Sequence, residues 1–166
     1  PELYLNKARL LLNLGLYQEA ESPAIKYLSY FPKAGPGHFI LGQIYEAQEK
    51  HVGISIPATG LVPDAMTVGM APSKLKDALH EYSRSGDDLK LKARAHNNRA
   101  LIFIRQNIFS RALEELNQAV AINPKMADAH YNMGKLLIQT NGYRGWARNH
   151  LETALKLTTD QKSRRE

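Results

Sequence analysis

The chain has 166 residues, of which 43% are hydrophobic and 23% charged, and it carries a net charge of +6. This composition is typical of one folded domain with its own core and argues against a disordered tail. The chain has no cysteine, so disulfides and thiolate metal sites are excluded. No apolar run approaches the ~18 residues of a membrane helix. The chain begins PELYLNKARL, without an initiator Met or a signal-peptide pattern, which indicates a processed or excised piece.

Two stretches of the chain resemble each other at a fixed spacing. AHNNRALIFIRQNIFSRALEELNQAVAINP (residues 95–124) and AHYNMGKLLIQTNGYRGWARNHLETALKL (residues 129–157) both open with Ala-His-x-Asn. Equivalent residues lie 34 apart, as in the pairs Ala95 and Ala129, Asn98 and Asn132, and Ala100 and Gly134. Self-similarity at such a period is the signature of a repeat architecture.

The pattern resembles the tetratricopeptide repeat, a helix-turn-helix unit of 34 residues. When each repeat is numbered from 1 to 34, small residues recur at positions 8 and 20. Position 8 holds Ala8, Gly42, Ala100 and Gly134, and position 20 holds Ala20, Ala78, Ala112 and Ala147. Two antiparallel helices approach closely only where a side chain is small. The resemblance implies an all-α fold, an antiparallel helix-pair solenoid that winds as a right-handed superhelix of four such repeats.

Taken in chain order, the repeats predict four helix pairs in a single domain covering residues 1–166. Repeat one (1–34) is expected to hold helices near 2–14 and 17–31, and repeat two (35–92) helices near 36–50 and 74–85. Repeat three (93–126) follows with helices near 89–106 and 109–122, and repeat four (127–161) with helices near 127–140 and 144–160. Residues 162–166 are left as a tail.

Repeat two is interrupted by an insertion at about residues 51–74. Its position 20 should fall on residue 54, but the alanine that fits the pattern is Ala78, 24 residues later. Much of the insertion is apolar, and long loops of this kind are often functional. It could pack on its own repeat, on a partner or on a second copy. The residues predicted to bind a partner are Ile54, Ile56, Leu61, Val62, Met66, Val68 and Met70.

Position 6 holds asparagine in three repeats, at Asn6, Asn98 and Asn132. In the tetratricopeptide family the first helices line the concave face, and this position commonly points into it. A carboxamide can donate and accept, so it can bind a peptide backbone without reading its side chains. The predicted peptide-binding residues are Asn6, Arg9, Phe39, Gln43, Arg94, Asn98, Arg105, Tyr131, Asn132 and Lys135. Their cations and apolar groups suit a peptide with acidic and hydrophobic residues.

No catalytic motif is present in the sequence. It lacks a cysteine nucleophile, a G-x-S-x-G elbow, a phosphate-binding loop and an H-E-x-x-H helix. Three histidines, His38, His96 and His130, share position 4 of their repeats, and they are expected to be packed or half-buried rather than metal-bound. We therefore expect no enzymatic activity, no cofactor and no metal site.

The predicted function is a scaffold or adaptor that holds a peptide segment or a partner helix in its concave groove. The alternative is an assembly module that forms a homo-oligomer through an uncapped C-terminal end or through the apolar insertion. Nucleic acid is disfavoured as a partner because the concave face lacks a ladder of base-stacking aromatics. No membrane span is expected, and the compartment is open, with the cytoplasm favoured.

Overall fold

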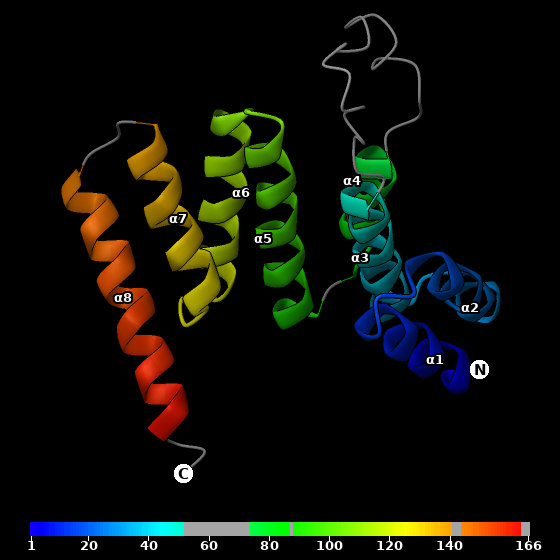
Figure 1. Ribbon diagram of the computed structural model, residues 1–166. Coiled ribbons are helices and arrows are strands. Elements are labelled where there is room, and N and C mark those ends of the chain that lie inside the picture. The colour runs from blue at the N-terminus through cyan, green and yellow to red at the C-terminus, as the bar shows by residue number, and fades with distance from the viewer. Residues whose placement is uncertain (52–73, 87, 141–143, 164–166) are drawn as a thin grey trace, which may run out of the picture. The chain divides into compact units, whose positions relative to one another are not determined.

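The computed structural model describes residues 1–51, 74–86, 88–140 and 144–163, without the side chains of residues 51, 161 and 163 (Figure 1). Regular structure in these ranges consists of eight α-helices. They are α1 (Glu2–Asn13), α2 (Tyr17–Tyr30), α3 (Gly35–His51), α4 (Lys74–Ser83), α5 (Leu89–Arg105), α6 (Phe109–Ile122), α7 (Ala127–Gln139) and α8 (Arg144–Ser163). The all-α prediction is confirmed, and the expected helix ends agree with the observed ones to within three residues.

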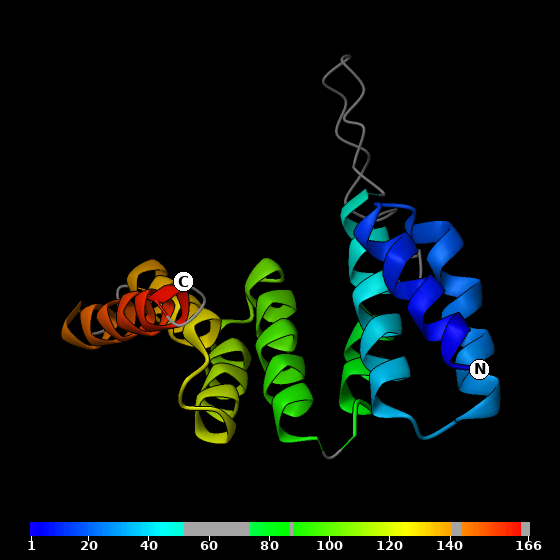
Figure 2. The same ribbon diagram turned by 90° about the horizontal axis from the view of Figure 1, so that it is seen from below.

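The helices group into two compact units, Pro1–Arg84 and Ser85–Glu166. In the first unit α1 packs on α2, α3 packs on α4, and α3 also contacts α1 and α2. The second unit repeats this arrangement, with α5 on α6, α7 on α8, and α7 also against α5 and α6 (Figures 1 and 2). Each unit is thus two stacked helix pairs, as the solenoid prediction requires. The grouping of both units into one domain stays a prediction.

The small residues at positions 8 and 20 lie where the paired helices meet. Their exposed fractions are 0% at Ala8, Ala20, Ala78, Ala100 and Ala112 and 2% at Ala147. A Cβ atom added to Gly42 would come within 2.8 Å of the Tyr82 ring, and one added to Gly134 within 2.6 Å of Leu151 Cγ. Close approach of the helices therefore explains why these positions exclude larger side chains.

Two of the turns within helix pairs close in the same way. Helix α1 ends before Gly15 (φ 78°) and α5 ends before Asn107 (φ 57°), and both residues occupy position 15 of their repeats. The N–H of Leu16 donates to the Leu11 carbonyl and that of Ile108 to the Phe103 carbonyl, each at 2.9 Å. These bonds to the last helical turn are those of a Schellman motif, which needs a left-handed residue. Glycine or asparagine is the residue type that adopts this conformation most readily.

The insertion falls between α3 and α4, which pack against each other. The Phe39 and Tyr82 rings lie 5.5 Å apart across that contact. This is the pairing expected for the two helices of one repeat. The seven residues proposed for partner binding, Ile54, Ile56, Leu61, Val62, Met66, Val68 and Met70, lie outside the described residues.

Candidate functional site

In the first unit one predicted peptide-binding residue is a core residue. Phe39 is only 2% exposed, and its ring packs against Tyr82 of α4. The prediction that Phe39 lines a binding surface is therefore wrong. The physical reason is the large aromatic at residue 82, which α4 brings over α3 and whose hydroxyl donates to Glu46 Oε2 at 2.8 Å.

The other predicted residues of this unit are more accessible. Asn6 and Arg9 are exposed on α1, and Gln43 is half-buried on α3. Their neighbour Ile40, which replaces asparagine at position 6, is only 5% exposed. In the first unit, therefore, α1 carries an asparagine at position 6 and α3 does not.

In the second unit the three predicted residues of α5 form a stripe together with Leu101. Arg94, Asn98, Leu101 and Arg105 recur in steps of four, three and four residues, which places them within about 60° of one another around a helix. Arg94 and Arg105 are exposed, whereas Asn98 and Leu101 are half-buried. The stripe therefore offers two cations flanking a carboxamide and an aliphatic side chain.

Helix α7 carries a second stripe of similar character. Tyr131, Lys135 and Ile138 are exposed and follow each other at steps of four and three residues. Tyr131 is 51% exposed and Ile138 is 58% exposed, and the Lys135 Nζ atom lies 5.5 Å from the centre of the Tyr131 ring. A half-exposed aromatic beside an amine and an aliphatic side chain is a surface that can bind protein.

A hydrogen bond joins the two helices. The Asn132 side chain donates from Nδ2 to Oδ1 of Asn97, which is only 5% exposed, at 2.9 Å. Because this bond joins residues beside the two stripes, we infer from helical spacing that both stripes lie on the same side of the α5–α7 contact. We call this surface the α5–α7 face. It comprises Arg94, Asn98, Leu101, Arg105, Tyr131, Asn132, Lys135 and Ile138.

The charge of the chain is concentrated in the unit that carries this face. Residues 1–84 contain eight Lys or Arg and eight Asp or Glu, whereas residues 85–166 contain fourteen and eight. The whole net charge of +6 therefore belongs to the second unit. Such an imbalance favours an acidic partner by long-range attraction.

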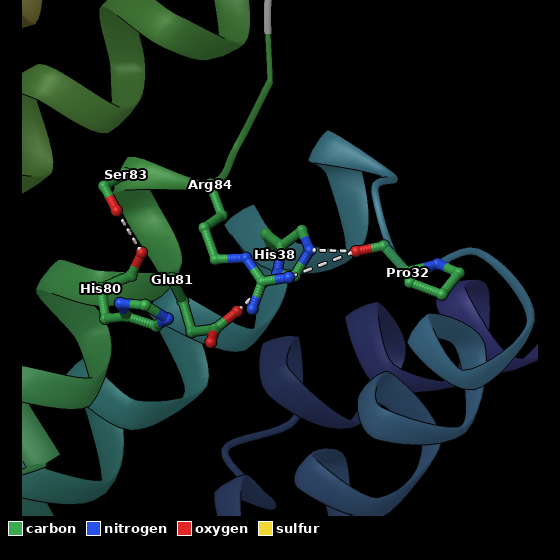
Figure 3. A network of polar contacts seen from close by, with 6 residues as sticks. All are labelled: Pro32, His38, His80, Glu81, Ser83 and Arg84. Atoms are coloured by element: carbon green, nitrogen blue, oxygen red, sulfur yellow. Dashed lines mark hydrogen bonds and ion pairs between the residues drawn. The ribbon is translucent and has the colours of Figure 1, made fainter.

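The position 4 histidines are packed, as expected, but their partners were not foreseen. His38 is 3% exposed and lies between two groups (Figure 3). Its Nδ1 atom is 2.6 Å from Glu81 Oε2, and its Nε2 donates to the Pro32 carbonyl at 2.8 Å. Arg84 also donates to that carbonyl, at 3.5 Å. This network links α3 to α4 and to the end of α2.

The histidines at position 4 of repeats three and four also have side-chain partners. His96 Nδ1 is 2.7 Å from Glu115, which also binds Arg99 at 2.8 Å. His130 Nδ1 is 3.0 Å from His150 Nδ1. When the insertion and the extra residue in the last turn are subtracted, Glu81, Glu115 and His150 all occupy position 23. The recurring spacing of histidine and glutamate was the signal in the sequence that could have revealed these pairs.

The first unit also has a hollow of about 500 Å³ near the start of α1. It is lined by Glu2, Tyr27, Tyr30, Phe31, Pro32, Lys33 and Ala34. Burial raises the pKa of Tyr27, and the nearby Glu2 carboxylate adds to the shift. None of the predicted site residues lines this hollow.

Two other kinds of site are absent from the described part of the chain. No group of three or more His, Cys, Asp or Glu there could hold a metal ion. None of the described helices has the length and apolar character needed to cross a membrane.

Paired helices with a small residue at each close contact define a helical-repeat protein of the solenoid class. Two family models match the chain, one described as tetratricopeptide repeat over residues 1–32 and one as TPR repeat over residues 100–141. The chain therefore contains tetratricopeptide repeats within these two ranges.

Solved structures agree with this fold. TTC0263, a thermophilic TPR protein of Thermus thermophilus, superposes with a TM-score of 0.70 at 20% identity, covering 99% of this chain and 77% of that one. The crystal structure of MamA gives a TM-score of 0.69 at 15% identity, covering 98% and 80%. In sequence the chain is 27% identical over 161 residues to mouse Protein O-mannosyl-transferase TMTC1. That match covers 97% of this chain but only 15% of the length of the relative.

Proposed function

We propose that the α5–α7 face binds an extended protein segment that carries acidic and apolar side chains. Tetratricopeptide repeats generally act as non-enzymatic scaffolds for interactions between proteins, and the fold supports that coarser role. The relative TMTC1 is named a protein O-mannosyl-transferase. Because this chain corresponds to 15% of it, we propose a binding part without catalytic activity of its own.

The observation that supports this proposal is the composition of the face. Arg94, Arg105 and Lys135 can each form a charge-assisted bond to a carboxylate. Tyr131 and Ile138 offer exposed apolar area between these cations. A peptide that alternates acidic and apolar residues would satisfy both kinds of group at once.

The two asparagines give the face a means to hold a backbone. Asn98 and Asn132 are half-buried on adjacent helices. The Asn132 side chain donates one hydrogen bond from Nδ2 to Asn97. Its side-chain oxygen can still accept a hydrogen bond from a peptide N–H. Such contacts add affinity without fixing the peptide sequence.

A library of random 12-residue peptides displayed on phage and selected on the 166-residue chain tests this proposal. We expect enrichment of Asp or Glu next to aliphatic or aromatic residues. Fluorescence anisotropy then gives the affinity of one enriched peptide for the chain and for Arg94→Glu with Lys135→Glu. This double change should weaken binding at least tenfold, since it replaces two attractions by repulsions.

The control is Arg148→Glu with Lys156→Glu, which reverses two exposed charges on α8, outside the face. It changes the net charge equally and should alter affinity much less. Equal losses in both double variants would show that only net charge matters and would reject the face as the binding site. Failure to enrich any acidic sequence would also count against it.

Self-association remains the alternative function. Helix α8 exposes Trp146 (63%) and Leu155 (70%), but they are nine positions apart, so they lie on opposite sides of the helix. They do not form a single apolar stripe for a second copy. Light scattering coupled to gel filtration tests the alternative: a monomer up to high micromolar concentration would remove its support.

A further inference from the structure

Repeat four differs from the other paired repeats at position 23. Glu81 and Glu115 occupy this position in repeats two and three and accept from His38 and His96. In repeat four the residue is His150, which faces His130 of α7. Two imidazoles thus meet where the other repeats pair an imidazole with a carboxylate.

The hydrogen bonds of His130 define which nitrogens carry protons at neutral pH. Its Nε2 lies 3.1 Å from the Pro124 carbonyl, which can only accept, so Nε2 carries a hydrogen. Neutral His130 then has its lone pair on Nδ1. The bond of 3.0 Å to His150 is therefore made by His150 Nδ1 donating to His130 Nδ1.

The pair can bind only one further proton without losing this hydrogen bond. A proton on His150 Nε2 leaves the bond intact, because Nδ1 of His150 still donates. A second proton would have to bind His130 Nδ1, which is the acceptor of that bond. Two donors 3.0 Å apart would then face each other, each on a cationic ring, and His130 is only 8% exposed. Both the lost bond and the repulsion oppose this state.

For the histidines with carboxylate partners, a further proton breaks no hydrogen bond. His38 can donate from both ring nitrogens at once, to Glu81 and to the Pro32 carbonyl. A protonated His38 therefore satisfies every contact it makes. The same holds for His96 opposite Glu115. Acidification from neutral pH to about pH 5.5 adds no unfavourable contact at these two sites.

The charged groups on the helices around the pair do not offset its charge. The nearest carboxylates in the sequence are Asp128 on α7 and Glu152 on α8, both exposed, and Glu115 on α6 is held by His96 and Arg99. Among the described residues none of these three carboxylates bonds to either imidazole.

The charged residues nearest to the pair in the sequence also include cations, Lys135 on α7 and Arg148 on α8, which cannot compensate a positive charge. Burial is the larger cause that lowers the pKa of His150, and the charge of His130 adds to the shift. The pKa of His150 is therefore shifted in the direction that opposes its protonation in the folded chain.

Separation of α8 from α7 would break no contact of α8 with another described helix. Among the described helices α8 packs on α7 alone. Local opening of an element that packs on a single neighbour costs less than global unfolding. We propose that the His130–His150 pair makes α8 separate from α7 on mild acidification, a sensitivity that the α3–α4 and α5–α6 pairs do not share.

The direction of the effect follows from proton binding. Well above the ordinary histidine pKa of about 6.5, both histidines are neutral in the folded and unfolded chains, and stability does not depend on them. Below it the unfolded segment takes up two protons, whereas the folded pair takes up at most one with its bond intact. Stability of the α7–α8 pair therefore falls as the pH drops from about 6.5 towards 5.5.

Hydrogen exchange on the 166-residue chain tests this inference. Protection factors for α7 and α8 amides are compared at about pH 7.5 and about pH 5.5, after correction for the intrinsic exchange rate. We expect a loss of about tenfold in α7 and α8, because the unfolded segment binds one more proton than the folded pair. Amides of α3 and α4 serve as the internal control and should keep their protection.

Two variants identify the cause. His150→Glu gives repeat four the carboxylate of repeats two and three, and His150→Gln keeps a neutral donor that does not titrate. Neither variant should lose protection of α7 and α8 on acidification. The inference is overturned if the wild-type chain keeps its protection on acidification, or if His150→Gln loses protection as the wild type does. Should neither variant fold, imidazole NMR titration of the wild type decides: independent titration of both rings near the ordinary histidine pKa would reject the proposal.

Discussion

Gly134 leaves no room for a side chain between α7 and α8. Alanine normally stabilises a helix interior relative to glycine by up to about 1 kcal/mol. Here a Cβ atom would lie 2.6 Å from Leu151 Cγ and 3.0 Å from the Ala147 carbonyl oxygen. We expect Gly134→Ala to lower the free energy of unfolding by about 1–3 kcal/mol, because α8 must move away to admit the methyl group. Urea unfolding followed by circular dichroism measures the change.

Gly145 provides the control for that substitution. It lies in the first turn of α8, and a Cβ atom added there would meet no atom within 4 Å. Gly145→Ala should therefore be neutral or slightly stabilising. If both substitutions had the same effect, the close approach of α7 and α8 would not be the reason for glycine at residue 134.

The His38 network is the second residue-scale feature that stability measurements can test. Glu81→Ala removes the acceptor for His38 Nδ1 in a site where both residues are buried, at 3% and 8% exposure. Loss of a charged, buried partner should cost about 2–4 kcal/mol. The comparison is Ser83→Ala, which removes an exposed bond of 2.6 Å to the His80 carbonyl and should change stability by less than about 0.5 kcal/mol (Figure 3). Similar losses in the two variants would contradict the role given to burial.

At the scale of one element, α5 has a side-chain cap. Asp88 accepts from the backbone N–H of Lys90 at 2.8 Å and of Leu91 at 3.1 Å. Asp88→Ala should cost about 0.5–2 kcal/mol, and Asp88→Asn should retain most of the stability because asparagine caps almost as well. Thermal unfolding of the two variants checks this, with the exposed Asp128→Ala as a reference. An equal loss in both Asp88 variants would point to charge rather than to capping.

The helices could be predicted from the sequence because their signals are local. The alanines and glycines at positions 8 and 20 fix the register, and the turn residues Gly15 and Asn107 end their helices by backbone conformation alone. The burial of Phe39 could not be predicted in the same way. It depends on Tyr82, which follows an insertion and reaches α3 only after the chain has folded back.

The candidate site was predictable only in part, for a related reason. The stripes on α5 and α7 follow from helical spacing. The predicted residues Arg94, Arg105, Tyr131 and Lys135 are exposed in the structure, and their role in binding stays a prediction. The bond between Asn132 and Asn97 joins two repeats, and position 5 carries no signal that it is buried. The pairing of position 4 with position 23 likewise joins two helices. The recurring spacing of histidine and glutamate is its signal in the sequence, but the contact itself is defined only when the side chains are placed.

At the scale of the whole molecule, charge is divided unequally between the two units. The first unit is neutral by formal charge and the second carries all of the +6. Electrostatic attraction of an acidic segment should therefore be directed to the second unit, where the α5–α7 face lies. This attraction acts over about 8–10 Å at physiological ionic strength and is weakened by salt.

The salt dependence of peptide binding tests whether this charge takes part. For an acidic peptide selected on the chain, we expect the affinity to fall about tenfold between about 50 and 500 mM NaCl, because three cations of the face contact carboxylates that salt screens. A version of the peptide with glutamine for glutamate should bind more weakly at low salt and respond little to salt. In Arg94→Glu with Lys135→Glu the dependence for the acidic peptide should flatten or reverse. Unchanged affinity across the salt range for the original chain would mean that apolar contacts alone hold the peptide.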